Sequence, residues 1–582
     1  MLLEAGPQTL SELVALSGFK LPAVRRALLV LVQHGMVHCH QPAPGAKDAP
    51  PARRRKDGSV MQQYVYEVCL PRMLHALLRT PTVLVKARDD MGEVTEKILE
   101  TLMEHGRLTL AQLQACVAPK LGGAEGEGVS EELREQLDVE IVGLAHAHYI
   151  EQAPTTATPP PWVRNKPNLP AAAGAPSKPK GVSTAVDSVN QYYYAGASRY
   201  NQVRFQLPPG LEARVRGLAA AGKVNPQKRK WMALSEGQDY DEGGLAPMSV
   251  DEEGAGGDRR GGAWGNGAGG GDAAVQWRVN FDEFNRRFRH AACADLVRQK
   301  LGGRAAAVIE AMLSAGRRFE TKVDEARSVP LSVQDVFLQL RDSGSDMSLE
   351  EVGAELDELN GDPLELISLV GDTPGGVAFC VNMSRILEFQ RLKEVEAGVR
   401  DRFGPLALRI FRLLVIKRQL EQKQIADMAM IPTKETREIL YRLLRHEYVS
   451  LQEVSRSTDH APTRTFYLWR VDTSTVAKRY MNDLLFVGGN LVHRLQHEIK
   501  KGEQVIDAAQ AALASQDSAS GSARVGLLME THKEQFDRMK RMVAGLETLL
   551  HRCDDAIALF ACCSAMRCIL LTKRLGVLRV SA

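Results

Sequence analysis

Paired carboxylates are the first residues of this sequence whose types and spacing could do chemistry. Asp239 and Asp241-Glu242 stand close together, and Asp251-Glu-Glu253 follows shortly after them. Such pairs act as general acid and base only where a dry, rigid surround shifts their pKa values. Both pairs lie in a glycine-rich stretch, so an acidic, solvated segment is the better interpretation.

Two further patterns resemble ligand sites. Gly265-x-Gly267-x-x-Gly270 formally matches a dinucleotide-binding fingerprint, but it follows no predicted strand and opens no predicted helix, which favours a flexible linker. His38-Cys39-His40 could suggest metal ligands, but neighbouring residues of a strand point to opposite faces and no second cluster is evident. No phosphate-binding loop, zinc-protease helix or nucleophile triad can be assembled. We therefore predict no catalytic residue, no metal and no cofactor.

Basic clusters offer a different kind of chemistry. One cluster falls between two predicted strands, at a wing position where it could contact DNA phosphates, with a solvated loop as the alternative; it consists of Arg53, Arg54, Arg55 and Lys56. A second cluster could be a nuclear-import signal or a loose nucleic-acid contact; it consists of Lys228, Arg229 and Lys230. These clusters must be positioned by the surrounding elements, which we expect to be helices and short strands.

Length and composition bound the class of protein. The chain has 582 residues, enough for roughly four folded units at ~150 residues each. Its net charge of +3 argues against a polybasic nucleic-acid binder, so any such contact is local. The nine cysteines form no Cys-x-x-Cys pair, which excludes a zinc ribbon. With no signal peptide and no apolar run near the ~18 residues of a membrane span, we expect a soluble, reduced, intracellular chain without membrane contact.

Helix caps and strands repeat along the chain. Thr9-Leu-Ser-Glu12 and Thr109-Leu-Ala-Gln112 are capping boxes, and each is followed by a second helical pattern and an apolar strand. Ser348-Leu-Glu-Glu351 opens a helix in a third copy, and Thr433–His446 is the helix in the recognition position of a fourth. His34 and His446 fall at helix C-termini, where we expect structural roles. Helix, turn, helix and strand in this order predict four winged helix-turn-helix units.

Heptad-like spacing marks the C-terminal region. Apolar residues at spacings of seven, or of alternating three and four, predict two helices joined by a polar turn. We interpret them as an antiparallel coiled-coil hairpin and its apolar positions as partner-binding; two ordinary amphipathic helices packed on a domain are the alternative. The candidate partner-binding residues are Leu485, Val492, Leu495, Ile499, Leu546 and Leu549.

The predicted fold class is mainly α with small β-wings. The predicted domains are a first winged helix, N-terminally shortened, at 1–75; a second at 82–152; a disordered Pro/Gly-rich linker at 153–275; a third winged helix at 276–384; a fourth at 385–475; the coiled-coil hairpin at 476–565; and an atypical tail at 566–582. A short element around Tyr192-Tyr-Tyr194 and Tyr200–Leu207 is the part of the linker that we expect to dock.

Several motifs resemble one known family. Leu408-Arg-Ile-Phe-Arg-Leu413, Leu420-Glu-Gln-Lys-Gln-Ile425 and Asp459-His-Ala-Pro-x-Arg464-Thr-Phe-Tyr-Leu468 look like the third subunit of eukaryotic RNA polymerase III. Asp282-x-Phe284-x-x-x-Phe288-Arg289 and Asn360-Gly-Asp-Pro-Leu364 are similar to it too. The resemblance runs from near Met1 to about Phe560, and the stretch from about Arg402 to Val471 is its most specific part.

The resemblance implies a function. It implies a non-catalytic polymerase subunit in the nucleus, similar to the large chain of general transcription factor II E, that joins two smaller subunits in a peripheral subcomplex on the clamp of the largest subunit. There it would help to open promoter DNA, as duplex or single strand, for transcription of small RNAs such as tRNA and 5S rRNA. It would contact DNA weakly and without strong sequence preference. A free-standing winged-helix transcription regulator is the alternative, and an unrecognised enzyme is a third hypothesis.

Overall fold

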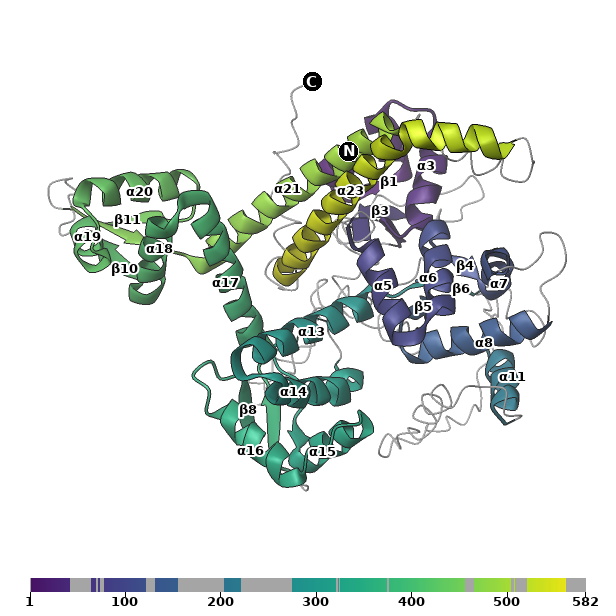
Figure 1. Cartoon of the computed structure of the whole chain (residues 1–582), viewed down its shortest axis with the longest axis horizontal. Coiled ribbons are helices and arrows are strands. Elements are labelled where there is room, and N and C mark those ends of the chain that lie inside the picture. Colours follow the sequence, from purple (N-terminus) through teal and green to yellow (C-terminus); the bar gives the residue numbers. More distant parts are fainter. Residues whose placement is uncertain are drawn as a thin grey trace, which may run out of the picture. The chain divides into compact units, whose positions relative to one another are not determined.

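The computed structural model describes the greater part of the chain (Figure 1). The described residues are 2–41, 64–69, 72–73, 78–121, 131–154, 204–220, 275–320, 323, 325–373, 376–455, 465–503, 507 and 521–561. They fall into two compact units, which divide between Phe284 and Asn285. Among the described helices, none is both long and apolar enough to cross a membrane.

The N-terminal sheet of the first unit orders its strands β1-β3-β2, all antiparallel. Its elements are α1 (Leu2–Ala5), β1 (Gln8–Thr9), α2 (Leu10–Ser17), α3 (Leu21–Gln33), β2 (Val37–His40) and β3 (Val65–Val68). The capping box predicted at Thr9 is present, with Glu12 reaching back to the Thr9 backbone N–H at 2.8 Å. Leu13, Leu28 and Val37 form the small core that ties α2 and α3 to the sheet.

The second sheet is completed from far along the chain. Its elements are α5 (Thr80–Met91), α6 (Glu93–His105), β4 (Leu108–Thr109), α7 (Leu110–Val117), α8 (Glu131–His146), β5 (Ile150–Gln152) and β6 (Gln276–Val279). Strand β6 lies between β4 and β5, and Trp277 on it is fully buried. The sequence-based boundary assigned residues 276–279 to the third unit; the strand pairing instead places them in the second sheet.

Part of the predicted linker is helical. Helix α11 (Pro209–Ala220) packs on α8 and buries Leu211 and Val215. Just before it, Arg204 forms an ion pair with the buried carboxylate of Glu151 on β5. The predicted disordered linker at 153–275 is therefore wrong for helix α11 at residues 209–220, while docking of the segment up to Leu207 was expected; apolar and ionic contacts fix both on the second sheet and its helices.

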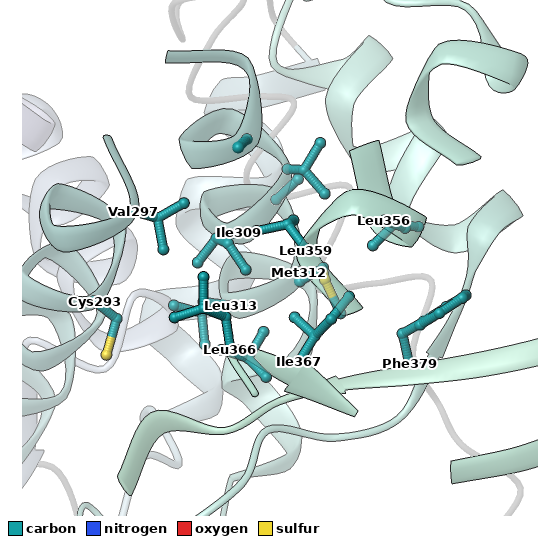
Figure 2. Packing of buried hydrophobic residues seen from close by; sticks show 14 of the residues in the cluster. Cys293, Val297, Ile309, Met312, Leu313, Leu356, Leu359, Leu366, Ile367 and Phe379 are labelled. Carbon is teal, nitrogen blue, oxygen red and sulfur yellow. The ribbon is translucent and has the colours of Figure 1, made fainter. Parts of the chain in front are cut away.

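The second unit begins with the third sheet, ordered β7-β9-β8. Its elements are α13 (Phe281–Leu301), α14 (Gly303–Gly316), β7 (Leu331–Ser332), α15 (Val333–Asp342), α16 (Leu349–Asn360), β8 (Ile367–Thr373) and β9 (Gly376–Val381). Figure 2 shows their core, in which Ile309 and Met312 of α14 meet Leu356 of α16 and Phe379 of β9. The capping box at Ser348 starts α16, as predicted.

The fourth sheet is ordered β10-β12-β11. Its elements are α17 (Met383–Phe403), α18 (Pro405–Lys417), β10 (Gln419–Glu421), α19 (Gln422–Ala429), α20 (Thr433–Arg445), β11 (Ser450–Ser455) and β12 (Thr465–Arg470). Phe411, Leu440 and Trp469 bring α18, α20 and β12 into one core. Every three-stranded sheet in the described part of the chain thus shares one strand order, first-third-second.

Two long helices follow, α21 (Thr473–Lys501) and α23 (Gly521–Ala561), and they pack along each other (Figure 1). Gly488 on α21 lies against Cys553 and Ile557 on α23, and Gly502 lies against Met539, so the helices run antiparallel. The end of α23 packs on two cores, since Leu559 contacts the third and Phe560 is buried in the fourth. The pair is therefore anchored in the neighbouring cores instead of standing apart from them.

Candidate nucleic-acid and partner interface

One helix precedes the last two strands of each sheet, the position of a recognition helix in a winged-helix fold. These helices are α3, α8, α16 and α20. The helix before each is fixed by a reciprocal cap, made by Thr9 for α2, Thr109 for α7, Ser332 for α15 and Glu421 for α19. A capping box satisfies backbone donors at the helix start and so fixes where the helix begins. What the recognition-position helices can bind depends on their outward faces.

The outward face of α16 is acidic. Glu350, Glu351, Asp357 and Glu358 are exposed along it. Hydrogen bonds from the backbone and hydroxyl of Ser348 lower the pKa of Glu351, which keeps that carboxylate charged. The nearest cation, Arg304, pairs with Glu351 at 3.0 Å. A helix with this face would be repelled by the phosphates that flank a DNA groove.

Helix α8 is partly covered by its neighbours. Asp138 on α8 is buried and accepts hydrogen bonds from Gln114 of α7 at 2.5 Å and Arg214 of α11 at 3.1 Å. Burial raises the pKa of Asp138, opposed by Arg214. The first half of the helix exposes two carboxylates and one guanidinium, those of Glu131, Glu132 and Arg134, which does not suit insertion into a DNA groove.

The remaining two recognition-position helices, α20 and α3, expose a mixture of side chains. On α20 the exposed charges are of both signs, four cations and two carboxylates: Lys434, Glu435, Arg437, Glu438, Arg442 and Arg445. The α3 region exposes Lys20, Arg25 and Arg26, but also Phe19 at 66% and Leu29 at 69%. Mixed charge and exposed apolar groups suit a protein partner or weak backbone contacts better than base reading, which needs a dedicated set of polar side chains in the major groove.

Two predicted clusters fall outside the described residues. These are the wing cluster Arg53, Arg54, Arg55 and Lys56 and the basic cluster Lys228, Arg229 and Lys230. The strands on either side of the wing, β2 and β3, pair in the register Val37 with Val68 and His40 with Val65. The wing cluster therefore lies in the connection between two paired strands.

The predicted partner-binding residues all lie on α21 and α23. Leu485, Val492, Leu495 and Leu546 are half-buried, whereas Ile499 is 43% exposed and Leu549 is 50% exposed. Phe486 and Val487, which the heptad pattern did not single out, are exposed at 64% and 47%. The two helices thus carry apolar groups both between them and on their flanks.

One ion cluster, which the sequence did not predict, holds segments together that are distant in the chain. The Glu320 carboxylate is fully buried and pairs with Arg289 at 3.1 Å, Arg286 at 3.2 Å and His290 at 2.9 Å. It joins the end of α14 to α13. Burial lowers the pKa of His290, with hydrogen bonding to Glu320 opposing that change. Arg289 belongs to a motif quoted above, but its partner lies 31 residues away, and no local spacing signals such a pair.

The histidines have structural settings. His34 and His446 are the C-cap residues of α3 and α20, as predicted. His38 and His40 stack at 5.8 Å between ring centroids, and burial lowers the pKa of His40. Within the described residues, no group of three or more His, Cys, Asp or Glu side chains could hold a metal ion. The described elements define a structural class: a chain of helix-turn-helix and wing units followed by an antiparallel pair of long helices.

Comparisons with known proteins narrow this class. Residues 1–41 match the profile described as "RNA polymerase III subunit RPC82 helix-turn-helix domain", residues 237–389 match "RNA polymerase III subunit RPC82", and residues 395–471 match "POLR3C, C-terminal winged-helix domain". The DNA-directed RNA polymerase III subunit RPC3 of Danio rerio is 28% identical over 96% of this chain and 93% of its own length. The subunit of Homo sapiens is 25% identical over the same shares, and that of Dictyostelium discoideum is 28% identical over 40% of this chain and 37% of its own.

The predicted resemblance is confirmed: the chain is similar over almost its whole length to the third subunit of RNA polymerase III. It is accordingly a non-catalytic polymerase subunit, and the predicted winged-helix, mainly helical fold is confirmed. The hypotheses of a free-standing regulator and of an unrecognised enzyme are not favoured.

Proposed function

We propose that this subunit works in a peripheral subcomplex of nuclear RNA polymerase III, with two smaller subunits at the clamp of the largest subunit. There it helps promoter opening at genes for small RNAs such as tRNA and 5S rRNA. It contacts DNA, as single strand or opening duplex, weakly and without strong sequence preference. The proposal includes four winged-helix domains, one for each three-stranded sheet, and a coiled coil formed by α21 and α23.

The outward faces of the recognition-position helices carry this proposal. An acidic α16 and a partly covered α8 leave little surface for base reading, and α20 mixes both signs. Specific readout needs bidentate donors aimed at base edges, each worth about 1–3 kcal/mol. A protein with these faces is better suited to hold partners and to touch phosphates, which carry charge but no sequence information.

The helix pair supports the assembly part of the proposal. Its seam holds half-buried Leu495 and Leu546, while exposed Phe486, Val487, Ile499 and Leu549 remain available to a partner subunit. Exposed apolar groups gathered on two packed helices are typical of interaction surfaces. We propose the six predicted residues as partner-binding residues on this basis, with Phe486 and Val487 added.

DNA binding by the full chain tests the nucleic-acid part. Fluorescence anisotropy with labelled duplexes and single strands of several unrelated sequences, over a salt series, should give similar affinities that weaken steeply with salt. A single sequence bound 100-fold or more tighter than the others would instead identify a sequence-specific regulator.

Assembly tests the partner part. The double variant Leu495→Asp/Leu546→Asp places charge in the seam and should sharply reduce recovery of the smaller subunits with the tagged chain. The matched control Gln496→Asp/Thr548→Asp changes exposed neighbours on the same helices and should leave recovery unchanged. Full assembly by the seam variant would assign the partner contacts to the winged units.

A further inference from the structure

A polar cavity lies at the start of α17 in the second unit. Its volume is about 250 Å³, and its lining includes Arg327, Ser368, Asn382, Ser384, Arg385 and Glu365. Ser368 comes from β8, Ser384 and Arg385 from the first turn of α17, and Arg327 from the segment before β7. The lining is therefore assembled from parts of the chain that are distant in sequence.

Backbone contacts on both sides fix the position of Arg327. The Ala326 carbonyl accepts a hydrogen bond from the Ser384 N–H at 3.0 Å. Ser328 exchanges two bonds with Val381, donating its N–H at 2.9 Å and accepting at its hydroxyl at 2.8 Å. Arg327 itself is exposed, and among the described residues it makes no hydrogen bond or ion pair. Its backbone is held at the cavity while its guanidinium is available to a ligand.

The N-terminus of α17 adds positive potential. This helix has 21 residues, and its N-cap residue, Asn382, gives no side-chain hydrogen bond to the first turn. The Asn382 side chain instead donates to the Glu365 carbonyl at 2.6 Å and accepts from the Ser368 hydroxyl at 2.9 Å. The Ser384 N–H of the first turn is already bonded to the Ala326 carbonyl, so the helix start favours an anion mainly through the positive end of the helix dipole.

The charges of the lining leave a net positive site. Arg385 pairs with the Glu365 carboxylate at 3.3 Å, but both side chains are more than 60% exposed. Such an exposed pair is worth little, so Arg385 can exchange this partner for a ligand at small cost. The positive groups of the lining, which are two guanidinium groups and a helix N-terminus, thus outnumber its one carboxylate, that of Glu365.

The neighbouring strands indicate which anion fits. Two positions along β8 from Ser368, at the bulge of the strand, Val370 is 51% exposed. An exposed apolar side chain on a strand that lines a cationic cavity matches a chain of phosphates with unstacked bases, because an exposed base can lie against it while the phosphate remains in the polar site. A duplex, whose bases are stacked inside, offers no such match.

We propose that this cavity binds a backbone phosphate of single-stranded nucleic acid, with Arg327 and Arg385 as its cationic ligands. Arginine suits the role because its planar group can donate two parallel hydrogen bonds to phosphate oxygens. The inference rests on the weak DNA contact proposed above and places one such contact in the third unit. No base edge is read there, so sequence preference is absent.

Charge variants of the full chain test the proposal. Arg327→Gln/Arg385→Gln should weaken binding of a labelled oligo-dT single strand and lower its log–log salt slope by about 0.7, the value for one lost phosphate contact. The same variant should lose the thermal stabilisation that wild type gains from inorganic phosphate over chloride at equal ionic strength. Glu365→Gln should act in the opposite direction and tighten oligo-dT binding. The matched control Arg304→Gln changes an exposed cation of the same unit outside the cavity and should do neither.

Three outcomes of these binding and stability measurements would each overturn the inference, for different reasons. If wild type binds oligo-dT and the double variant binds it equally well, the cavity is no contact for nucleic acid and the inference is wrong. Loss of the phosphate effect with unchanged oligo-dT binding would assign the cavity to a free anion, which also overturns it. If wild type fails to bind oligo-dT at low salt, the proposed DNA contact itself fails, and the inference fails with it.

Discussion

Replacing Phe560 with alanine is expected to loosen the end of α23 from the core of the fourth sheet. The Phe560 side chain is fully buried, and its ring lies 5.5 Å from that of Tyr480, centroid to centroid. Truncating a buried phenylalanine costs about 3–5 kcal/mol, from lost apolar contact and the cavity left behind. The free energy of opening for the packed ends of α21 and α23 should fall by that amount.

Hydrogen exchange read by mass spectrometry measures this change directly. A loss of 3–5 kcal/mol raises local exchange roughly 100-fold to 4,000-fold, at 1.4 kcal/mol for each factor of ten. The rise should appear in the peptides of α17, α21 and α23 that surround Phe560, while those of α15 and α16 keep their protection. Leu549→Ala on the same helix is the matched control; Leu549 is 50% exposed, so little should change.

A second readout follows from Tyr480. Burial is the main cause that raises the pKa of Tyr480 to about 12. Opening the Phe560 site hydrates this ring, so the pKa of Tyr480 should fall toward its ordinary value of 10.0. Unchanged exchange around α21 together with an unchanged Tyr480 titration would refute the conclusion that the helix pair is anchored in the fourth core.

Three further predictions concern ions. Glu320→Gln removes the counter-charge of buried Arg289 and should destabilise the second unit by about 3–5 kcal/mol in urea unfolding. Glu310→Gln, whose ion pair is exposed, should cost about 1 kcal/mol or less, and equal losses would contradict the argument. Burial raises the pKa of Glu67 from 4.5 to about 7, so the unfolded chain ionises first and the stability of the N-terminal sheet should fall as pH rises between those values. Glu67→Gln should flatten that slope, and an unaltered pH profile of unfolding would count against it. Changing Arg53, Arg54, Arg55 and Lys56 to Ala should weaken duplex binding equally for all sequences and reduce the salt slope by ~0.9 per lost contact; an unchanged slope would assign the cluster to a solvated loop.

Local signals in the sequence predicted the helices well. The reciprocal caps at Thr9, Thr109 and Ser348 depend on residues three positions apart, so the pattern of the chain alone locates them. The order of helices and strands likewise follows from local apolar periodicity. The winged-helix fold could therefore be predicted before any contact was known.

Contacts between distant residues could not be predicted in the same way. Strand β6 joins the second sheet across more than a hundred residues, and its partners Thr109 and Ile150 carry no mark of that pairing. The Glu320 cluster and the cavity around Arg327 also depend on segments that only tertiary packing brings together. A domain boundary placed where the composition changes misses a strand that pairs with a sheet far away in the sequence, because strand pairing depends on packing and not on composition.

Membership of the polymerase is the central claim, and affinity purification of the tagged full chain with quantitative mass spectrometry tests it most directly. The account predicts that RNA polymerase III subunits, including its largest subunit and two smaller partners, are recovered in equal molar amounts with the chain. Recovery of the chain alone, or with other proteins and no polymerase subunits, would contradict it.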